Sequence, residues 1–78
     1  MTKDQIFDTL ERSAQQILPD LGGSVQRTDS FDALGINSLD LADIAIATLD
    51  KLQLDIPLNE LAGAKTFGEL ADTIHAKS

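Results

Sequence analysis

The chain of 78 residues contains 13 acidic and 6 basic residues, which give a formal net charge of −7 at pH 7. Its hydrophobic fraction of 42% is ordinary for a globular protein, and a chain this short can bury only one core, so we predict a single domain over residues 1–78. The acidity excludes nucleic acid and anionic membrane surfaces as expected partners, and the absence of Cys excludes disulfides and thiolate metal sites.

The first predicted element is an amphipathic helix over residues 3–17. Thr2 and Gln5 have the spacing of a capping box, and Pro19 ends the pattern because proline disfavours helical geometry in the residue before it. The apolar residues between them recur at three- and four-residue spacing: Ile6, Phe7, Leu10, Ala14, Ile17 and Leu18.

Residues 19–37 lose this periodicity and are rich in turn-forming residues, among them Gly22, Gly23 and Ser24. A connection of that length is uncommon in so small a domain. Phe31 and Leu34 lie in its second half, and we expect them to pin the connection to the core as a packed crossover.

A second helical pattern runs over residues 39–52 and has more apolar residues than one core-facing stripe needs. A helix of this kind is central in the fold or exposes a contact surface. Residues 58–62 allow one short helical turn after Pro57. Thr66 and Glu69 then repeat the capping-box spacing before a last helix that we expect to end near Ala76.

These elements predict an all-α fold, a small bundle of three main helices and one short helix with a long first loop. No segment shows the alternation of a strand.

The segment that carries chemical information precedes the second helix. Gly35 permits a tight turn, and Asn37 is a strong candidate for the N-cap, which would place Ser38 in the first helical position with its hydroxyl free. A phosphodiester on Ser38 would gain from the helix dipole and from nearby amide donors. The alternative is that Ser38 itself caps the helix and that Asn37 is a turn residue.

The segment resembles the attachment motif of the acyl and peptidyl carrier protein family. The family's Leu-Gly-x-Asp-Ser-Leu run reads here Leu34-Gly35-Ile36-Asn37-Ser38-Leu39. The resemblance covers nearly the whole chain and extends through Asp55-Ile56-Pro57 to the Thr66-Phe67-Gly68-Glu69-Leu70 start of the last helix. It therefore implies the fold of an acyl-carrier-like bundle.

The resemblance also implies a function and a cofactor. Ser38 would carry 4′-phosphopantetheine, added from coenzyme A by a phosphopantetheinyl transferase, with Asn37 as the helix cap beside it. The thiol of this arm would hold acyl or aminoacyl thioesters for fatty-acid, polyketide or nonribosomal-peptide enzymes. The expected protein is a non-catalytic, monomeric carrier in the cytoplasm, and its start at Met1 and end at Ser78 favour a freestanding protein.

The family's second helix is its usual recognition surface, which docks on basic patches of acyl-loading and acyl-processing enzymes. The positions of this chain that the resemblance maps onto that surface are Leu39, Asp40, Asp43, Ile46 and Asp50.

Two departures from the family pattern affect these expectations. Asn37 replaces the family's usual Asp, which removes a negative charge beside the attachment site and affects which transferase modifies the chain. Ala45, Leu49 and Lys51 occupy positions where the family often has bulkier or more acidic residues, so we expect partner contacts that are more apolar than usual.

Two other classes of function are weaker alternatives. One is an unmodified helical module for protein–protein interaction. The other is an enzyme, for which the sequence offers no nucleophile–base pair. His75 is the only His, so neither a metal site nor a catalytic triad is expected.

Overall fold

The computed structural model describes residues 1–21 and 25–78, and it confirms the predicted all-α class. The three main helices are α1 (Lys3–Ile17), α2 (Ser38–Leu52) and α3 (Phe67–Lys77). Two 3₁₀ turns complete the described elements, η1 (Pro19–Leu21) and η2 (Leu58–Leu61). The turn-forming character predicted for Gly22, Gly23 and Ser24 concerns residues outside those described.

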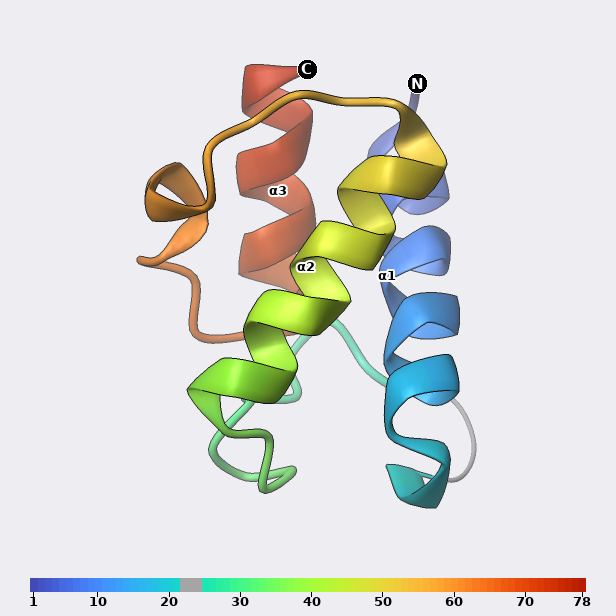
Figure 1. Cartoon of the computed structure of the whole chain (residues 1–78), viewed down its shortest axis with the longest axis vertical. Coiled ribbons are helices and arrows are strands. Elements are labelled where there is room, and N and C mark those ends of the chain that lie inside the picture. Colours follow the sequence, from blue (N-terminus) through green and yellow to red (C-terminus); the bar gives the residue numbers. More distant parts are fainter. Residues whose placement is uncertain (22–24) are drawn as a thin grey trace.

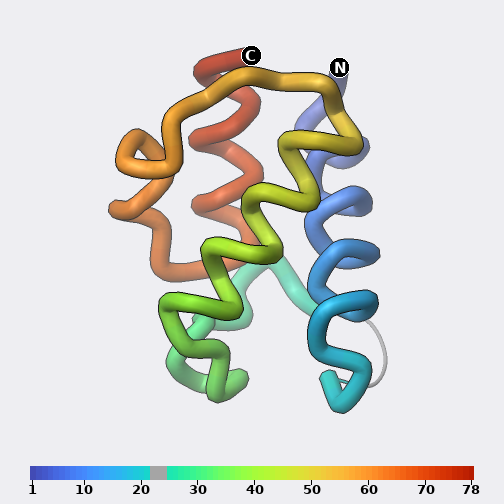
Figure 2. The backbone as a smooth tube through the Cα atoms, viewed as in Figure 1, coloured from blue at the N-terminus to red at the C-terminus, as the bar shows by residue number. Residues whose placement is uncertain are grey.

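The helices α1 and α3 lie side by side, and α2 crosses in front of them (Figure 1). Helix α1 packs against both α2 and α3, whereas η2 contacts α2 on one side and α3 on the other. Both termini lie at one end of the molecule, and α2 begins at the other end, beside the long first connection (Figure 2). The start of α2 is therefore far from either chain end.

Capping interactions set the helix boundaries as the sequence predicts for α1. The Thr2 hydroxyl accepts a hydrogen bond from Gln5 N at 3.1 Å, and Gln5 Oε1 accepts one from Thr2 N at 2.9 Å. The two bonds satisfy amides that a helix start otherwise leaves without partners. Pro19 then begins η1, a turn that the sequence analysis did not predict.

The start of α3 differs in part from its predicted capping box. Thr66 Oγ1 accepts from Glu69 N at 3.1 Å, but the Glu69 carboxylate accepts from Lys65 N at 2.9 Å instead of from Thr66 N. The backbone of Thr66 is extended, with φ −127° and ψ 162°, which leaves the Lys65 amide within reach of Glu69. The helix ends at Lys77, one residue beyond the expected end.

The core consists of aliphatic side chains around two aromatic rings. The Phe31 and Phe67 rings are 4.9 Å apart and meet edge to face at 72°, a favourable geometry for an aromatic pair. Phe31 is buried and Leu34 is half-buried against the core, as expected for residues that pin the first connection. The fully buried aliphatic residues come from all three helices: Ile6, Leu10, Ala14, Ile44, Ala71 and Ile74.

The second half of the first connection is fastened to the start of α3 by backbone hydrogen bonds. Phe31 N donates to Lys65 O at 3.0 Å, and Gly68 N donates to Arg27 O at 2.9 Å. An isolated antiparallel bridge pairs Ser30 with Thr66, a contact that the helical pattern could not predict. The result is that Phe31 is held beside the start of α3, where its ring meets that of Phe67.

An ion pair secures the same connection from outside. Arg27 donates a hydrogen bond to the Asp72 carboxylate at 2.7 Å, and Lys3 Nζ lies 3.8 Å from the same oxygen. The hydrogen bond from Arg27 holds the pKa of Asp72 below its ordinary value of 3.8. Arg27 also lies 5.8 Å from the centre of the Phe7 ring, within range of a cation–π contact.

Candidate functional site

The division of roles between Asn37 and Ser38 defines the site. Asn37 is the N-cap of α2: its Oδ1 accepts from Asp40 N at 2.8 Å, and its backbone φ of −81° and ψ of 172° are non-helical. The alternative in which Ser38 caps the helix is therefore wrong, because Ser38 is the first residue of α2. Its side chain is exposed, and its hydroxyl forms no hydrogen bond within the described part of the chain.

The turn that precedes Ser38 is fixed on both sides. Gly35 has a φ of 73°, in the left-handed region that residues with a Cβ rarely adopt. Ile36 follows it and is buried, and its amide donates to Phe31 O at 2.9 Å. The turn thus leaves Ser38 exposed at the surface, while the buried Ile36 side chain anchors the preceding backbone to the core.

Ser38 lies at the edge of two cavities with different linings. The first, the apolar pocket, has a volume of about 220 Å³ and lies between α2, η2 and α3. Apart from Ser38, its lining is entirely apolar and includes Ala42 and Ala45 of α2 with Leu61 and Ala62. It offers a hydrocarbon group a place away from water.

The second cavity, the Lys65 groove, has a volume of about 320 Å³ and follows the first connection towards the start of α3. Its lining combines the apolar residues Ile36 and Ala64 with the polar residues Ser30, Asp32 and Lys65. Phe31, Ser38 and Leu41 line both cavities, so the two meet at Ser38.

The exposed face of α2 carries most of the residues that the resemblance assigned to partner binding. Leu39 is 77% exposed and Ile46 is 52% exposed, which is unusual for large apolar side chains that have no partner to cover them. Asp43 and Asp50 are exposed on the same helix, and Asp40 is half-buried. All five residues that the resemblance assigned to partner binding are therefore at least partly exposed.

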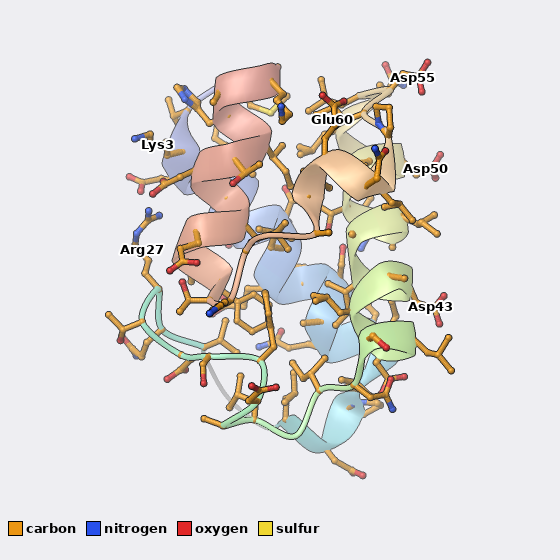
Figure 3. All side chains as sticks on the ribbon, turned by 90° about the vertical axis from the view of Figure 1, so that its left-hand side faces the viewer. Lys3, Arg27, Asp43, Asp50, Asp55 and Glu60 are labelled. Carbon is orange, nitrogen blue, oxygen red and sulfur yellow. The ribbon has the colours of Figure 1, made fainter. Side chains whose placement is uncertain are left out.

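Three acidic side chains near α2 lie on the opposite edge of the molecule from two basic side chains. Figure 3 shows Asp43, Asp50 and Asp55 along one edge of the molecule and Lys3 and Arg27 along the opposite edge. Coulomb attraction between a partner's basic patch and this acidic edge acts over about 8–10 Å at physiological salt.

One exposed apolar residue near this face was missed by the sequence analysis. Leu58 opens η2 and is 38% exposed. The sequence did contain a sign of this exposure, because Leu58 is a large apolar residue directly after Pro57, at the start of a turn too short to bury it.

Two of the three α2 positions that depart from the family pattern, Ala45 and Leu49, do not reach the surface. Both are buried, at 4% and 6% exposure, because they lie on the side of α2 that faces the core. Lys51 points towards α1, where its Nζ donates to Gln16 Oε1 at 2.6 Å and to Ser13 Oγ at 3.2 Å. The apolar contacts available on the α2 face are those of Leu39 and Ile46.

No cluster of three or more His, Cys, Asp or Glu suited to a metal ion occurs among residues 1–21 and 25–78. In the same residues, no helix combines the length and the apolar character needed to cross a membrane.

Comparisons with known proteins agree on one family. Residues 8–74 match the family model described as the phosphopantetheine attachment site. Over 78 residues the chain is 38% identical to the polyketide biosynthesis acyl-carrier-protein AcpK of Bacillus subtilis, a match that covers 99% of this chain and 95% of that protein. Over 70 residues it is 31% identical to an acyl carrier protein of Rhodococcus erythropolis, covering 88% of this chain and 77% of that one.

A solved structure gives the same result in three dimensions. The chain is similar, with a TM-score of 0.89 and 42% identity, to a chain in the crystal structure of the curacin biosynthetic pathway HMG synthase in complex with acetyl donor-ACP. The match covers 97% of this chain and 99% of that chain, so the similar molecule is the small carrier and not the synthase.

Proposed function

The chain belongs to the acyl carrier protein family, and from that premise we propose that Ser38 bears a 4′-phosphopantetheine arm on which the protein presents an acetyl group to an HMG synthase of polyketide biosynthesis. The observation that carries the proposal is the exposed, unbonded hydroxyl of Ser38 at the first position of α2, within the region that matches the attachment family. It is the atom that such a modification requires.

The residues around Ser38 fit a phosphodiester. Because Asn37 supplies the cap, the Ser38 oxygen can be esterified without removing a hydrogen bond from the fold. The first amides of α2 and the positive end of its dipole face the same region, and both favour a negative group. The cofactor, when bound, supplies the terminal thiol that holds an acyl group as a thioester.

In the attachment step the chain contributes the hydroxyl oxygen of Ser38. Ser38 Oγ forms a bond to the phosphorus that bears pantetheine, the phosphoanhydride bond of coenzyme A breaks, and the adenosine bisphosphate half leaves. A transferase would accept the serine proton, because no basic side chain is hydrogen-bonded to Ser38 within the described residues. The protein thus acts as a non-catalytic substrate of its transferase. We place it in the cytoplasm as a monomer, where coenzyme A is available.

Partner docking is assigned to the α2 face. Leu39 and Ile46 supply apolar contacts, and Asp40, Asp43 and Asp50 supply charge that complements a basic patch. Electrostatic complementarity raises the rate of encounter more than the final affinity, which suits a carrier that must leave each partner. Docking should therefore be weak and sensitive to salt.

The acetyl cargo and the HMG synthase partner rest on likeness to the donor carrier of the curacin complex and on likeness to a polyketide carrier. A two-carbon group makes little use of the apolar pocket, so the pocket does not select the cargo. Selection would instead lie with the enzyme that loads the arm.

Intact-protein mass spectrometry tests the attachment. The purified chain is incubated with coenzyme A and a broad-specificity transferase, alongside Ser38→Ala and a matched Ser78→Ala control at the exposed C-terminus. We expect one phosphopantetheine on the wild type and on S78A, and none on S38A. No gain by the wild type with two different transferases would favour the unmodified interaction module.

A second assay tests the cargo and the partner. The acetyl-loaded protein is mixed with an HMG synthase and an acceptor carrier that bears a β-ketoacyl group, and acetyl loss from this chain is followed by mass. Loss should depend on the synthase and should fall as salt is raised. Retention of the acetyl group would refute the assigned partner while leaving the attachment intact.

A further inference from the structure

We infer that the Lys65 groove is the resting site of the arm, in which Lys65 pairs with the phosphodiester and the floor of the groove packs against pantetheine. The inference rests on the proposed modification of Ser38. It assigns to Lys65 and its neighbours a binding role that neither the sequence pattern nor the α2 docking face includes.

Lys65 is unusual among the basic side chains of this protein. Within the described residues it is the one Lys or Arg without an acidic or hydrogen-bonding side-chain partner. The other basic residues are engaged as follows: Lys3 and Arg27 with Asp72, Arg12 with Asp8, Lys51 with Ser13 and Gln16, and Lys77 with Glu60. In a chain with a net charge of −7, an unpaired cation beside the attachment residue is available for an anion.

Lys65 is held in place by the backbone on which it sits. Its carbonyl accepts from Phe31 N at 3.0 Å, and its amide donates to the Glu69 carboxylate at 2.9 Å. These bonds fix the Cα of Lys65 against the first connection, on the same groove that Ser38 lines. The four-carbon side chain of Lys65 is flexible, so it can turn towards a phosphate attached to Ser38 in the same groove while its backbone stays fixed.

The chemistry of the groove matches pantetheine better than the apolar pocket does. Pantetheine has two amides, a hydroxyl and a pair of methyl groups, and apart from Ser38 the apolar pocket has no polar side chain to hydrogen-bond its polar groups. The groove provides Ile36 and Ala64 for the methyl groups, and Ser30 and Asp32 for the polar groups.

The polar groups of the groove also set the direction of the arm. Ser30 Oγ accepts a hydrogen bond from Ala33 N at 3.1 Å, which leaves the hydroxyl proton free to donate to an amide carbonyl. The Asp32 carboxylate accepts from amide N–H groups but repels a phosphodiester. The phosphodiester therefore belongs beside Lys65, and an amide N–H belongs beside Asp32.

Methyl NMR of the loaded protein tests this assignment directly. Protein labelled at Ala and Ile methyl groups is converted to the holo form, its mass is confirmed, and NOEs from the two pantetheine methyl groups are recorded. The groove predicts NOEs to Ala64 and Ile36. NOEs to Ala42, Ala45 and Ala62 would place the arm in the apolar pocket and overturn the inference, as would the absence of any NOE to the protein.

Matched charge variants test the role of Lys65. Lys65→Gln and Lys77→Gln remove the same charge, but Lys77 lies outside the groove and pairs with Glu60. The Ala64 methyl shift of each variant is compared with its values in the apo and holo wild type, which gives the ratio of groove-bound to free arm. This ratio should fall about two- to fivefold in K65Q, the range expected for loss of an exposed ion pair. Lys65→Arg should preserve the ratio.

An equal response of K65Q and K77Q would show a general charge effect and overturn the role of Lys65. Failure of the protein to gain the arm at all would remove the proposed function together with this inference. A holo protein that lacks the groove NOEs would remove only the inference.

Discussion

Gly68→Ala is the substitution for which the structure gives the clearest expected cost. A Cβ at residue 68 would lie 2.8 Å from Arg27 O and 3.1 Å from Arg27 Cβ, and the nearer of these is a backbone atom. The same oxygen accepts the hydrogen bond from Gly68 N at 2.9 Å. Either the first connection or the start of α3 must move, and the hydrogen bond must lengthen.

Two opposing effects decide the size of the change. Forcing a methyl group into a closely packed site typically costs about 1–3 kcal/mol. Replacing glycine by alanine recovers about 0.4–1 kcal/mol, because the unfolded chain loses conformational freedom. We therefore expect G68A to lower the free energy of unfolding by roughly 1–2 kcal/mol, since overpacking exceeds the entropic gain.

Urea and thermal unfolding monitored by circular dichroism measure this change. The midpoint temperature should fall by about 4–8 °C for each kcal/mol lost in a domain of this size. Gly63→Ala is the matched control: nothing lies within 4 Å of its added Cβ, and its effect should stay within about 0.5 kcal/mol. If G68A and G63A unfold alike, the close approach between Arg27 and α3 does not constrain the fold as argued.

Three further predictions concern the cap of α2, its exposed face and the ion pair of the first connection. Asn37→Ala should lower the free energy of unfolding by about 1 kcal/mol in urea titrations, while Asn37→Asp should be nearly neutral because Asp caps equally well. Leu39→Ser should leave unfolding unchanged, because this side chain is 77% exposed, yet weaken binding to a partner enzyme in calorimetry; an unchanged affinity would remove Leu39 from the docking surface. Arg27 lowers the pKa of Asp72 in the folded state, so their pairing stabilises the fold above the unfolded pKa and is lost as pH falls through the folded one. Stability measured from neutral pH to below 3.8 should therefore decline less steeply for Asp72→Asn than for the wild type.

The sequence was sufficient for the features that depend on local chemistry. Caps and helical periodicity involve residues within a few positions of one another, so Thr2 with Gln5 located the start of α1 correctly. Local chemistry left the cap to either Asn37 or Ser38, and the resemblance to carrier proteins favoured Asn37, which the structure confirms. The position of the candidate attachment residue was therefore predictable without a structure.

Features that depend on distant parts of the chain were not predictable. Val25 and Ile36 are buried, but they lie in an aperiodic connection where no spacing marks the inward side. The orientation of Ala45 and Leu49 required knowledge of which side of α2 faces the other helices, because α2 is apolar on more than one side. The pairing of Ser30 with Thr66 joins residues 36 positions apart, and both of their segments contribute side chains to the Lys65 groove.

The charges of this small protein are distributed unevenly, so one edge is more negative than the opposite edge. Asp43, Asp50 and Asp55 lie along the more negative edge, while on the opposite edge Lys3 and Arg27 offset the charge of Asp72 (Figure 3). In the field of a basic surface such a molecule is turned before it collides, so a larger fraction of encounters begin with α2 facing the partner. Orientation of this kind raises the rate of productive encounter without slowing dissociation, which under the proposed function would let one carrier serve several enzymes in quick succession.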